Sequence, residues 1–364
     1  MNSVAQSDYV VEQFSLQKEN LDEFANILTE TFLSDPAALE EGAVITFTKE
    51  SFDFFFNTPI TDPNLFVRVI HKPTNKIVGF LGNLPRNISM MGKVYKFVNP
   101  GWISVLPSHR RKGLATLMGR KFLELIIKEG YDGAFAVFEP EQHGKDIARI
   151  VTNENEMDQR TIFYTKKFIV RAFDEKKIAE VVKMKWFEKL AFKLMKGVKP
   201  VKNPSVRLSK EKDTEQIYNL LLEHIERNDI AVVHDKEYIK MLVNHRLFLC
   251  AIHEDDNGAI DGLIGAWEFL LSGFGKSYPF GWLDMVHTHK LSTRDAKDMC
   301  NFLCYSAKER GWMGIQTPYF PYFDAKPLKK AKFIFYGKRL FLDIAKLKDI
   351  EIPDKIESIF FDWR

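Results

Sequence analysis

The stretch Val105-Leu106-Pro107-Ser108-His109-Arg110-Arg111-Lys112-Gly113-Leu114-Ala115-Thr116-Leu117 (VLPSHRRKGLATL) joins two different patterns. A strand-like apolar run stops at Pro107, and a basic turn follows it. From Leu114 to Ile127 apolar residues recur at helical spacing and form a broad apolar face. The turn therefore lies between the end of a strand and the start of a helix.

The start of this helix is suited to binding an anion, because unpaired N–H groups and the positive end of the helix dipole lie there. Gly113 and Ala115 keep side chains out of the way, so a pyrophosphate can contact the backbone amides from Arg111 to Ala115. Arg110 and Arg111 would supply positive charge. The alternative interpretation is an ordinary basic turn at the surface.

The strands around the turn predict a crossover. Leu65–Ile70, Lys76–Leu81 and Lys93–Val98 are strand-like runs with short turns between them, and the third continues to Val105. After the helix, Gly133–Phe138 is a buried strand by its length and composition. A strand–helix–strand crossover of this kind places the helix N-terminus at the carboxyl end of its strand.

Caps and spacing predict further elements in the first half of the chain. A strand is predicted at Phe168–Phe173, and helices are predicted at Asn20–Leu28 with Asn20 as the cap, at Lys49–Phe56 after the Thr48 cap, at Arg160–Phe163 and at Ala179–Met195.

The run Gly197–Pro204 contains two prolines, a glycine and no apolar stripe, which is typical of a linker. We therefore expect domains at 1–196 and 206–364 with a linker at 197–205. The second domain repeats the first in outline. It has predicted strands at Leu247–Ile252, Ile260–Trp267 and Gly281–Val286, and predicted helices at Asp213–Glu226, Lys236–Val243 and Thr293–Arg310.

The second copy has His287-Thr288-His289-Lys290-Leu291 where the first has its basic glycine turn. Because no glycine lies there, we expect no pyrophosphate site in the second copy. His287 and His289 could ligate a metal, but no third ligand is near them in the sequence. Structural or substrate-facing histidines are therefore the favoured interpretation, and no metal site is predicted.

Composition limits the function classes. The 52 basic and 49 acidic residues give a net charge of +3, which offers no case for a nucleic-acid partner. Cys250, Cys300 and Cys304 lack metal-type spacing and predict a reducing compartment. No signal peptide or membrane-spanning run is present, so we expect a cytoplasmic protein without stable membrane insertion. The amphipathic run Lys183–Lys193 either packs on its own domain or docks on an anionic membrane.

The residues Arg110 to Ala115 fit the Arg/Gln-x-x-Gly-x-Gly/Ala pattern of the GNAT superfamily of acyl-CoA-dependent N-acyltransferases. The order of segments over nearly the whole chain resembles N-myristoyltransferases, which are two fused GNAT copies. The resemblance implies a mixed α/β fold of two tandem GNAT domains, each a mostly antiparallel sheet flanked by helices. The sequence departs from those enzymes at Gly113, where they have a basic residue, and at Ile334–Gly337, which replaces their glycine-aspartate-glycine turn.

The resemblance also implies a cofactor site and an acceptor site. Acetyl-CoA or a longer acyl-CoA would bind the first copy, and an amine acceptor, a small molecule or a peptide N-terminus, would bind the degenerate second copy. Backbone amides near Trp102 and Ile103, with Val105 below, would face the thioester and pantetheine in a gap between splayed strands. The pyrophosphate would contact the turn formed by Arg110, Arg111, Lys112, Gly113, Leu114 and Ala115.

Acyl transfer to an amine needs a base and an acid. Glu139 directly follows the buried strand and is the predicted base, with Glu141 and His143 as reserves; the alternative is that Glu139 only marks an exposed strand end. Tyr164 is the predicted acid by resemblance. The carboxylate of Arg364 is a further candidate base, because the terminal carboxylate has that role in N-myristoyltransferases.

The leading hypothesis is an acyl-CoA-dependent N-acyltransferase, and the favoured activity is transfer of an acetyl group to a primary amine. Long-chain acyl transfer to peptide N-termini is the alternative within enzymes. A non-catalytic module that binds CoA or a peptide is the alternative from another class.

Overall fold

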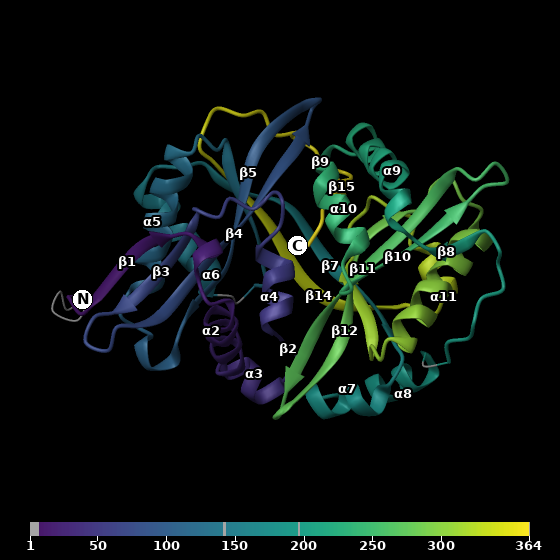
Figure 1. Cartoon of the computed structure of the whole chain (residues 1–364), viewed down its shortest axis with the longest axis horizontal. Helices are drawn as coiled ribbons and strands as arrows, with labels where there is room; N and C mark the ends of the chain where they lie inside the picture. The colour runs from purple at the N-terminus through teal and green to yellow at the C-terminus, as the bar shows by residue number, and fades with distance from the viewer. Residues whose placement is uncertain (1–6, 141–142, 196, 364) are drawn as a thin grey trace.

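The computed structural model describes residues 7–140, 143–195 and 197–363. Within them, one mixed sheet of fifteen strands runs through the whole molecule, and helices cover it on both sides (Figure 1). We call residues 7–195 the first half and residues 197–363 the second half. The strand order is β1-β3-β4-β5-β6-β14-β7-β13-β12-β11-β10-β8, with β2, β9 and β15 beside this path. The predicted mixed α/β architecture is confirmed.

The first half contributes a meander and a crossover. Its strands are β1 (Tyr9–Phe14), β2 (Val44–Thr46), β3 (Phe66–His71), β4 (Lys76–Met90), β5 (Lys93–Val105), β6 (Gly133–Phe138) and β7 (Gln159–Ala172). Its helices are η1 (Leu16–Lys18), α2 (Leu21–Leu33), α3 (Pro36–Glu41), α4 (Lys49–Phe56), η2 (Pro107–His109), α5 (Leu114–Lys128), α6 (His143–Glu154), α7 (Glu175–Val181) and α8 (Trp186–Met195).

The second half repeats this order. Its strands are β8 (Val206–Leu208), β9 (Ile230–Val233), β10 (Phe248–Glu254), β11 (Ile260–Gly273), β12 (Lys276–His287), β13 (Gly314–Pro318), β14 (Ile334–Lys346) and β15 (Ile359–Phe360). Its helices are η3 (Glu211–Asp213), α9 (Thr214–Arg227), α10 (Lys236–Asn244), α11 (Thr293–Glu309) and α12 (Lys326–Lys330). Helix α11 follows β12 as α5 follows β5, so the internal repeat is present.

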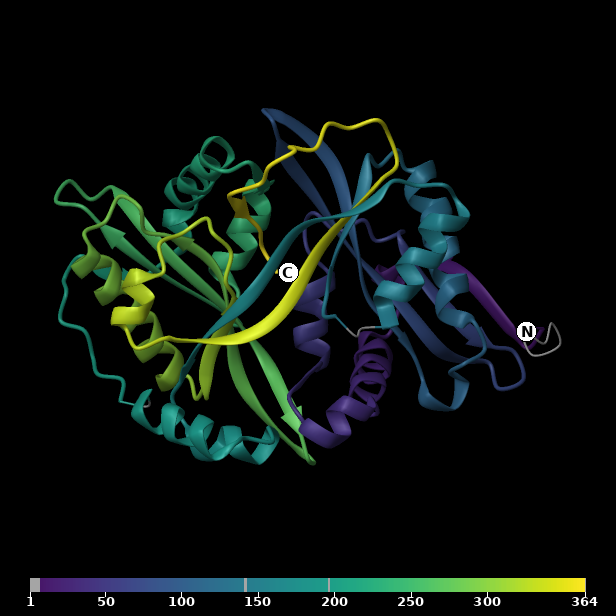
Figure 2. The ribbon, with the colours of Figure 1, turned by 180° about the vertical axis from the view of Figure 1, so that it is seen from behind.

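The two halves exchange a strand. β14, from the second half, pairs with β6 along six positions, from Phe341↔Phe138 to Lys346↔Gly133. β7, from the first half, pairs with both β14 and β13. Figure 2 shows these two long strands crossing the middle of the molecule side by side, in teal and yellow. Each half of the sheet is therefore completed by a strand from the other half.

The caps explain why several helices begin where the sequence places them. The side chain of Asn20 accepts a hydrogen bond from the Asp22 N–H, and Thr48 forms a capping box with Ser51. The helix predicted at Arg160–Phe163 is wrong, because these residues belong to β7, whose pairing with β14 overrides local spacing. The helix predicted at Ala179–Met195 is two helices, α7 and α8, separated at Val182–Lys185.

The cysteines have the expected structural role. Cys250, Cys300 and Cys304 are free and buried. Burial raises the pKa of the Cys250 and Cys304 thiols to about 12, so both stay protonated and behave as small apolar side chains. No helix in the described part of the chain is both long and apolar enough to cross a membrane.

Candidate active site

A gap opens between β5 and β6. These parallel strands pair at only two positions, Phe97↔Gly133 and Val98↔Ala134. Beyond them β6 pairs with β14 on its other side, while β5 runs on to Val105 without a ladder to β6. The carboxyl ends of the two strands therefore diverge, as expected, and α5 starts beside the open end of the gap.

A β-bulge lies in β5 at the edge of this gap. The register of β4 and β5 shifts between Gly82↔Gly101 and Phe80↔Ser104, so Trp102 and Ile103 oppose the single residue Leu81. Trp102 has a positive φ of 63°, which is strained for a residue with a side chain. Because a bulge leaves its extra residue outside the ladder, its backbone N–H can point toward a ligand.

Aromatic rings pack around the Trp102 side chain. The centroids of Phe32, Phe47 and Phe55 lie 5.7, 5.0 and 5.2 Å from the indole, each ring roughly perpendicular to it. Edge-to-face contacts of this kind stabilise a ring by about 0.5–1.5 kcal/mol beyond burial of its area. These rings from α2, α4 and the segment before it hold the strained bulge in place.

The start of α5 presents backbone amides in a concave turn. Gly113 is the N-cap with φ 74°, and Arg111 also has a positive φ of 61°. No side chain in the described ranges caps this helix. Alternation of left-handed and other conformations in successive residues aims N–H groups at one point and makes an anion-binding concavity. Leu114 is buried, so it anchors the helix and leaves its backbone N–H at the turn.

The Arg110 side chain turns toward the protein rather than the surface. Its Nε donates to the Val105 carbonyl at 3.2 Å, and one Nη donates to the Thr31 carbonyl at 2.7 Å and to the Ser34 hydroxyl at 2.8 Å. These bonds join the end of β5 to the C-terminus of α2. Arg110 thus fixes the position of the turn, and its charge faces main-chain oxygens.

The other basic side chains of the turn differ in exposure. The Lys112 ammonium donates to the Tyr9 hydroxyl at 2.7 Å, and the same hydroxyl lies 2.8 Å from His109 Nδ1. Arg111 is exposed, and no side chain among residues 7–140, 143–195 and 197–363 is paired with it. Arg111 is therefore the cation that faces solvent beside the amides of the turn.

The corresponding turn of the second half is closed. Ser292 is the N-cap of α11, and its hydroxyl accepts a hydrogen bond from the Asp295 N–H at 3.2 Å. The acidic Asp295 in the first helical turn repels an anion. The two turns thus differ in capping, because α5 starts without a side-chain cap and α11 starts with the Ser292 cap.

The two predicted acid–base residues occupy neighbouring strand positions. Phe138, Phe341 and Tyr164 are directly paired across β6, β14 and β7, and Glu139 follows Phe138. The Glu139 carboxylate is 43% exposed and lies 2.6 Å from the Lys338 ammonium. The Tyr164 ring stacks on Phe341 at 4.9 Å.

A second tyrosine near Glu139 was not predicted from the sequence. Tyr336 is 36% exposed, and the partial burial of its phenol, followed by the negative charge of Glu139, raises the pKa of that phenol. Tyr336 lies on β14, and its partners come from distant segments, so no local signal could have found it. Of the remaining candidates, His143 is the exposed first residue of α6, and Glu141 and Arg364 lie outside the described residues.

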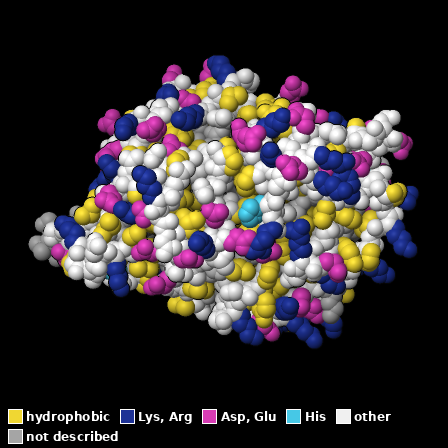
Figure 3. Space-filling model, viewed as in Figure 1, with side chains coloured by type: hydrophobic (Ala, Val, Ile, Leu, Met, Phe, Trp, Pro, Cys, Tyr) yellow, Lys and Arg dark blue, Asp and Glu magenta, His cyan; other side chains and the backbone are white. Residues whose placement is uncertain are grey.

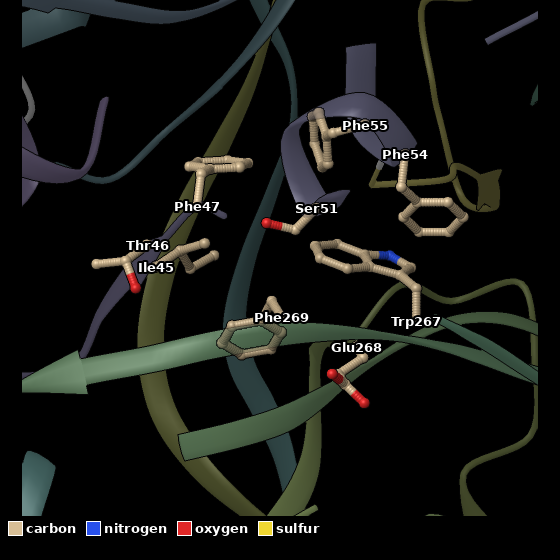
Figure 4. A pocket seen from close by; sticks show the side chains of 9 residues that line it. All are labelled: Ile45, Thr46, Phe47, Ser51, Phe54, Phe55, Trp267, Glu268 and Phe269. Atoms are coloured by element: carbon tan, nitrogen blue, oxygen red, sulfur yellow. The ribbon is translucent and has the colours of Figure 1, made fainter. Parts of the chain in front are cut away.

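Two cavities differ sharply in size and lining. The first, of about 10 Å³, lies where Phe47, Phe55 and Trp267 meet, directly beside the rings around Trp102 (Figure 4). The second, of about 410 Å³, is lined by polar and charged side chains that include Arg86 from β4 and Lys96 from β5, and by Val232 and Val233 from β9. Lys96 precedes the paired Phe97, so the larger cavity adjoins the closed end of the gap.

Comparisons with known proteins agree with this geometry. Residues 14–138 match the family described as Acetyltransferase (GNAT) domain. The crystal structure of Saccharomyces cerevisiae N-myristoyltransferase with bound myristoyl-CoA superposes with a TM-score of 0.77 and 16% identity, over 94% of this chain and 84% of that one. A GCN5-related N-acetyltransferase from Kribbella flavida superposes with a TM-score of 0.51 and 14% identity, over 94% and 72% of the two chains. Among curated protein sequences none matches the chain.

Proposed function

We propose that this chain, which resembles GNAT N-acyltransferases and has the two-copy fold of N-myristoyltransferases, transfers an acyl group from a CoA thioester to a primary amine by direct attack. The observation that carries the proposal is the strained bulge at Trp102 beside the uncapped start of α5, because the first suits a thioester carbonyl and the second a pyrophosphate.

The roles of the residues follow from their positions. The amides of Arg111 to Ala115 would hold the pyrophosphate, and Arg111 would add charge. The amides at Trp102 and Ile103 would stabilise the oxyanion that forms when the amine attacks. Glu139 would accept the proton of the amine, and Tyr164 or Tyr336 would donate one to the thiolate of CoA that leaves.

We propose a short acyl group such as acetyl. The cavity that Phe47 and Phe55 line together with Trp267, beside the indole of Trp102, has a volume of about 10 Å³, which is far too small for a fatty chain. The cavity of about 410 Å³ is large enough for a fatty chain, but its lining includes Asp62, Arg86 and Lys96. Charged side chains disfavour an alkyl chain because they would lose hydration without a polar partner.

Long-chain transfer to peptide N-termini is the second candidate, and the full-length superposition on N-myristoyltransferase supports it. Release of CoA from acetyl-CoA and from myristoyl-CoA, each with a panel of amines and N-terminal glycine peptides, separates the candidates. The first proposal expects turnover with acetyl-CoA and none with myristoyl-CoA. The reverse result would favour the second candidate, and saturable CoA binding without turnover would favour a binding module.

A further inference from the structure

A cluster of three potential metal ligands lies at the carboxyl end of β12. His287 ends this strand, His289 follows it, and Glu223 reaches the same point from α9. One ligand atom from each lies within 4.8 Å of the others. Because the third ligand comes from a helix far earlier in the chain, the sequence interpretation that lacked a third ligand missed this arrangement.

The spacing of these atoms suits a small divalent cation. Glu223 Oε2 lies 3.6 Å from His287 Nε2 and 3.4 Å from His289 Nε2. Two ligand atoms that each lie about 2 Å from a tetrahedral zinc ion are about 3.3 Å apart. The ligand atoms of the two histidines also lie within 4.8 Å of each other, so a contraction of the cluster would bring all three atoms into bonding distance.

The environment of His287 is the strongest indication that this cluster binds a metal ion. Its side chain is fully buried, and its Nε2 has no hydrogen-bond partner in the described part of the chain. On the other side of the ring, Nδ1 lies 3.2 Å from Nε2 of the buried His224. When His287 Nδ1 donates to His224, the lone pair of Nε2 faces the Glu223 carboxylate, and such a second partner is typical of metal-bound histidine.

The surroundings leave one side of the cluster accessible. His289 is partly exposed, which gives an ion a path from solvent. Lys290 pairs with Glu223 Oε1 and leaves Oε2 to the two histidines. Arg227 and Lys290 are the cations that act on this cluster, and they would weaken metal binding without blocking it.

We infer that Glu223, His287 and His289 form a zinc site, with water as the fourth ligand. The site lies between β12 and α11, where the first half has its anion-binding turn between β5 and α5. A bound ion would join α9 to the end of β12. This inference does not depend on acyl transfer.

The test is zinc retention by the full chain. The protein is loaded with Zn²⁺, dialysed against metal-free buffer and analysed for metal content, and Co²⁺ absorption reports the coordination. We expect about one ion per chain, a tetrahedral Co²⁺ spectrum and a higher Tm with Zn²⁺. Glu223→Gln and His289→Ala should each weaken Zn²⁺ binding at least about tenfold.

Asp261→Asn is the matched control, because Asp261 pairs with His253 at 2.6 Å in another histidine–carboxylate contact of the second half. It should leave zinc retention unchanged. Retention of less than about a tenth of an equivalent by the unmodified chain would overturn the inference. Equal retention by Glu223→Gln, His289→Ala and the unmodified chain would also overturn it. Both variants lie at partly exposed positions, and circular dichroism verifies that they fold.

A separate observation concerns helix α8. Its Trp186, Leu190 and Leu194 form one row at a spacing of four residues, and Phe187 lies beside it; all four are exposed, with Trp186 at 77% and Leu194 at 72%. The expectation that this helix packs mainly on its own domain is therefore only half right. Met195 is buried against the protein, while the opposite face is an apolar surface that no described side chain covers.

Positive charge borders this apolar row. Lys185, Lys189 and Lys193 form a parallel row one residue earlier on the helix, and all three are exposed. Figures 1 and 2 place α8 along the same edge of the molecule as α3 and the tip of the β11–β12 hairpin, which carry the exposed Leu39 and Phe274. Figure 3 shows basic, acidic and hydrophobic side chains together along this lower edge.

We propose that this edge docks on anionic membranes. Apolar side chains beside a row of lysines are the signature of a helix that lies in the plane of a lipid interface. Lysines attract acidic headgroups, and Trp186 would enter the headgroup region.

Co-sedimentation with phosphatidylserine–phosphatidylcholine vesicles tests this proposal. We expect binding that falls with salt and a blue shift of Trp fluorescence, both lost in the double variant Trp186→Ser, Leu194→Ser. The control Val94→Ser removes an apolar side chain that is exposed at the tip of the β4–β5 hairpin, and it should bind normally. No binding at low salt, or a dimer in solution that the double variant abolishes, would overturn the proposal.

Discussion

Asp362 and Arg86 form an ion pair that is almost completely removed from water. Their side chains are 0% and 3% exposed, and Arg86 Nε lies 3.0 Å from Asp362 Oδ1. His234 Nε2 lies 3.4 Å from the other carboxylate oxygen. Burial by itself would raise the pKa of Asp362, but Arg86 and His234 outweigh it and lower that pKa below its ordinary value. The pair joins β4 to the C-terminal segment.

We expect Asp362→Asn to destabilise the protein by about 3–5 kcal/mol at pH 7, because it leaves the Arg86 guanidinium buried without a counter-charge. The folded pKa of Asp362 is depressed, so its contribution is present above the unfolded pKa of about 3.9 and is lost as pH falls toward the folded value. Urea unfolding at pH 7 and at pH 3 measures both effects. An equal difference between variant and unmodified chain at the two pH values would contradict this assignment.

Glu139 is the residue on which the proposed chemistry depends. We expect Glu139→Gln to lower kcat by about 10²–10⁴-fold with little change in the KM for acyl-CoA, since a general base acts only in the transition state. Steady-state kinetics measure the two constants. Lys338→Met is the matched control, because it breaks the same ion pair and keeps the carboxylate. Equal loss of activity in both variants would mean that activity depends on the Glu139–Lys338 ion pair and not on Glu139 as a base.

At the scale of elements, two glycines with positive φ flank helix α5, and their surroundings differ. Gly113 begins the helix at φ 74°, and Gly130 follows its end at φ 72°, where a Cβ would meet no atom within 4 Å. Only the first lies beside the uncapped amides. The helix therefore contains its own control for the effect of backbone strain.

We expect Gly113→Ala and Gly130→Ala to lose similar stability, about 1–2 kcal/mol each, because L-residues resist the left-handed region. Only Gly113→Ala should weaken CoA binding, by at least about tenfold or about 1.4 kcal/mol. Titration calorimetry with CoA and thermal unfolding measure the two effects. Equal CoA affinity in both variants would mean that these amides do not hold the cofactor.

At the scale of the whole molecule, the exchange of β7 and β14 makes each half of the sheet depend on the other. The largest apolar cluster also spans both halves, with Phe56 and Phe80 from the first and Leu242 and Phe269 from the second. The Thr46 and Ser272 hydroxyls are hydrogen-bonded at 2.6 Å where β2 pairs with β11. Contacts of this kind are formed by both halves together.

We therefore expect fragments 1–196 and 197–364 to be insoluble or only partly folded when they are expressed separately, because each lacks a central strand and exposes apolar surface. Co-expressed, they should form a one-to-one complex. Size-exclusion chromatography and circular dichroism follow both outcomes. Two separately soluble fragments with native-like cooperative unfolding would contradict this interdependence.

The sequence predicts much of the first half correctly because the signals there are local. A few neighbouring residues are enough to identify the caps at Asn20 and Thr48, the apolar period of α5 and the buried strand Gly133–Phe138. The helix expected at Arg160–Phe163 failed because that segment is a central strand whose partners lie in β14, more than a hundred residues later.

By itself the sequence determined the strand–turn–helix unit around Gly113, the internal repeat and the absence of a glycine turn at the corresponding place in the second half, since each depends on neighbouring residues. Tertiary structure alone decided that Arg110 faces main-chain carbonyls, that Lys338 pairs with Glu139 and that Glu223 joins the two histidines. Backbone conformation and capping are set over one helical turn, whereas the partner of a side chain is set by strand pairing between distant segments, which no local pattern records.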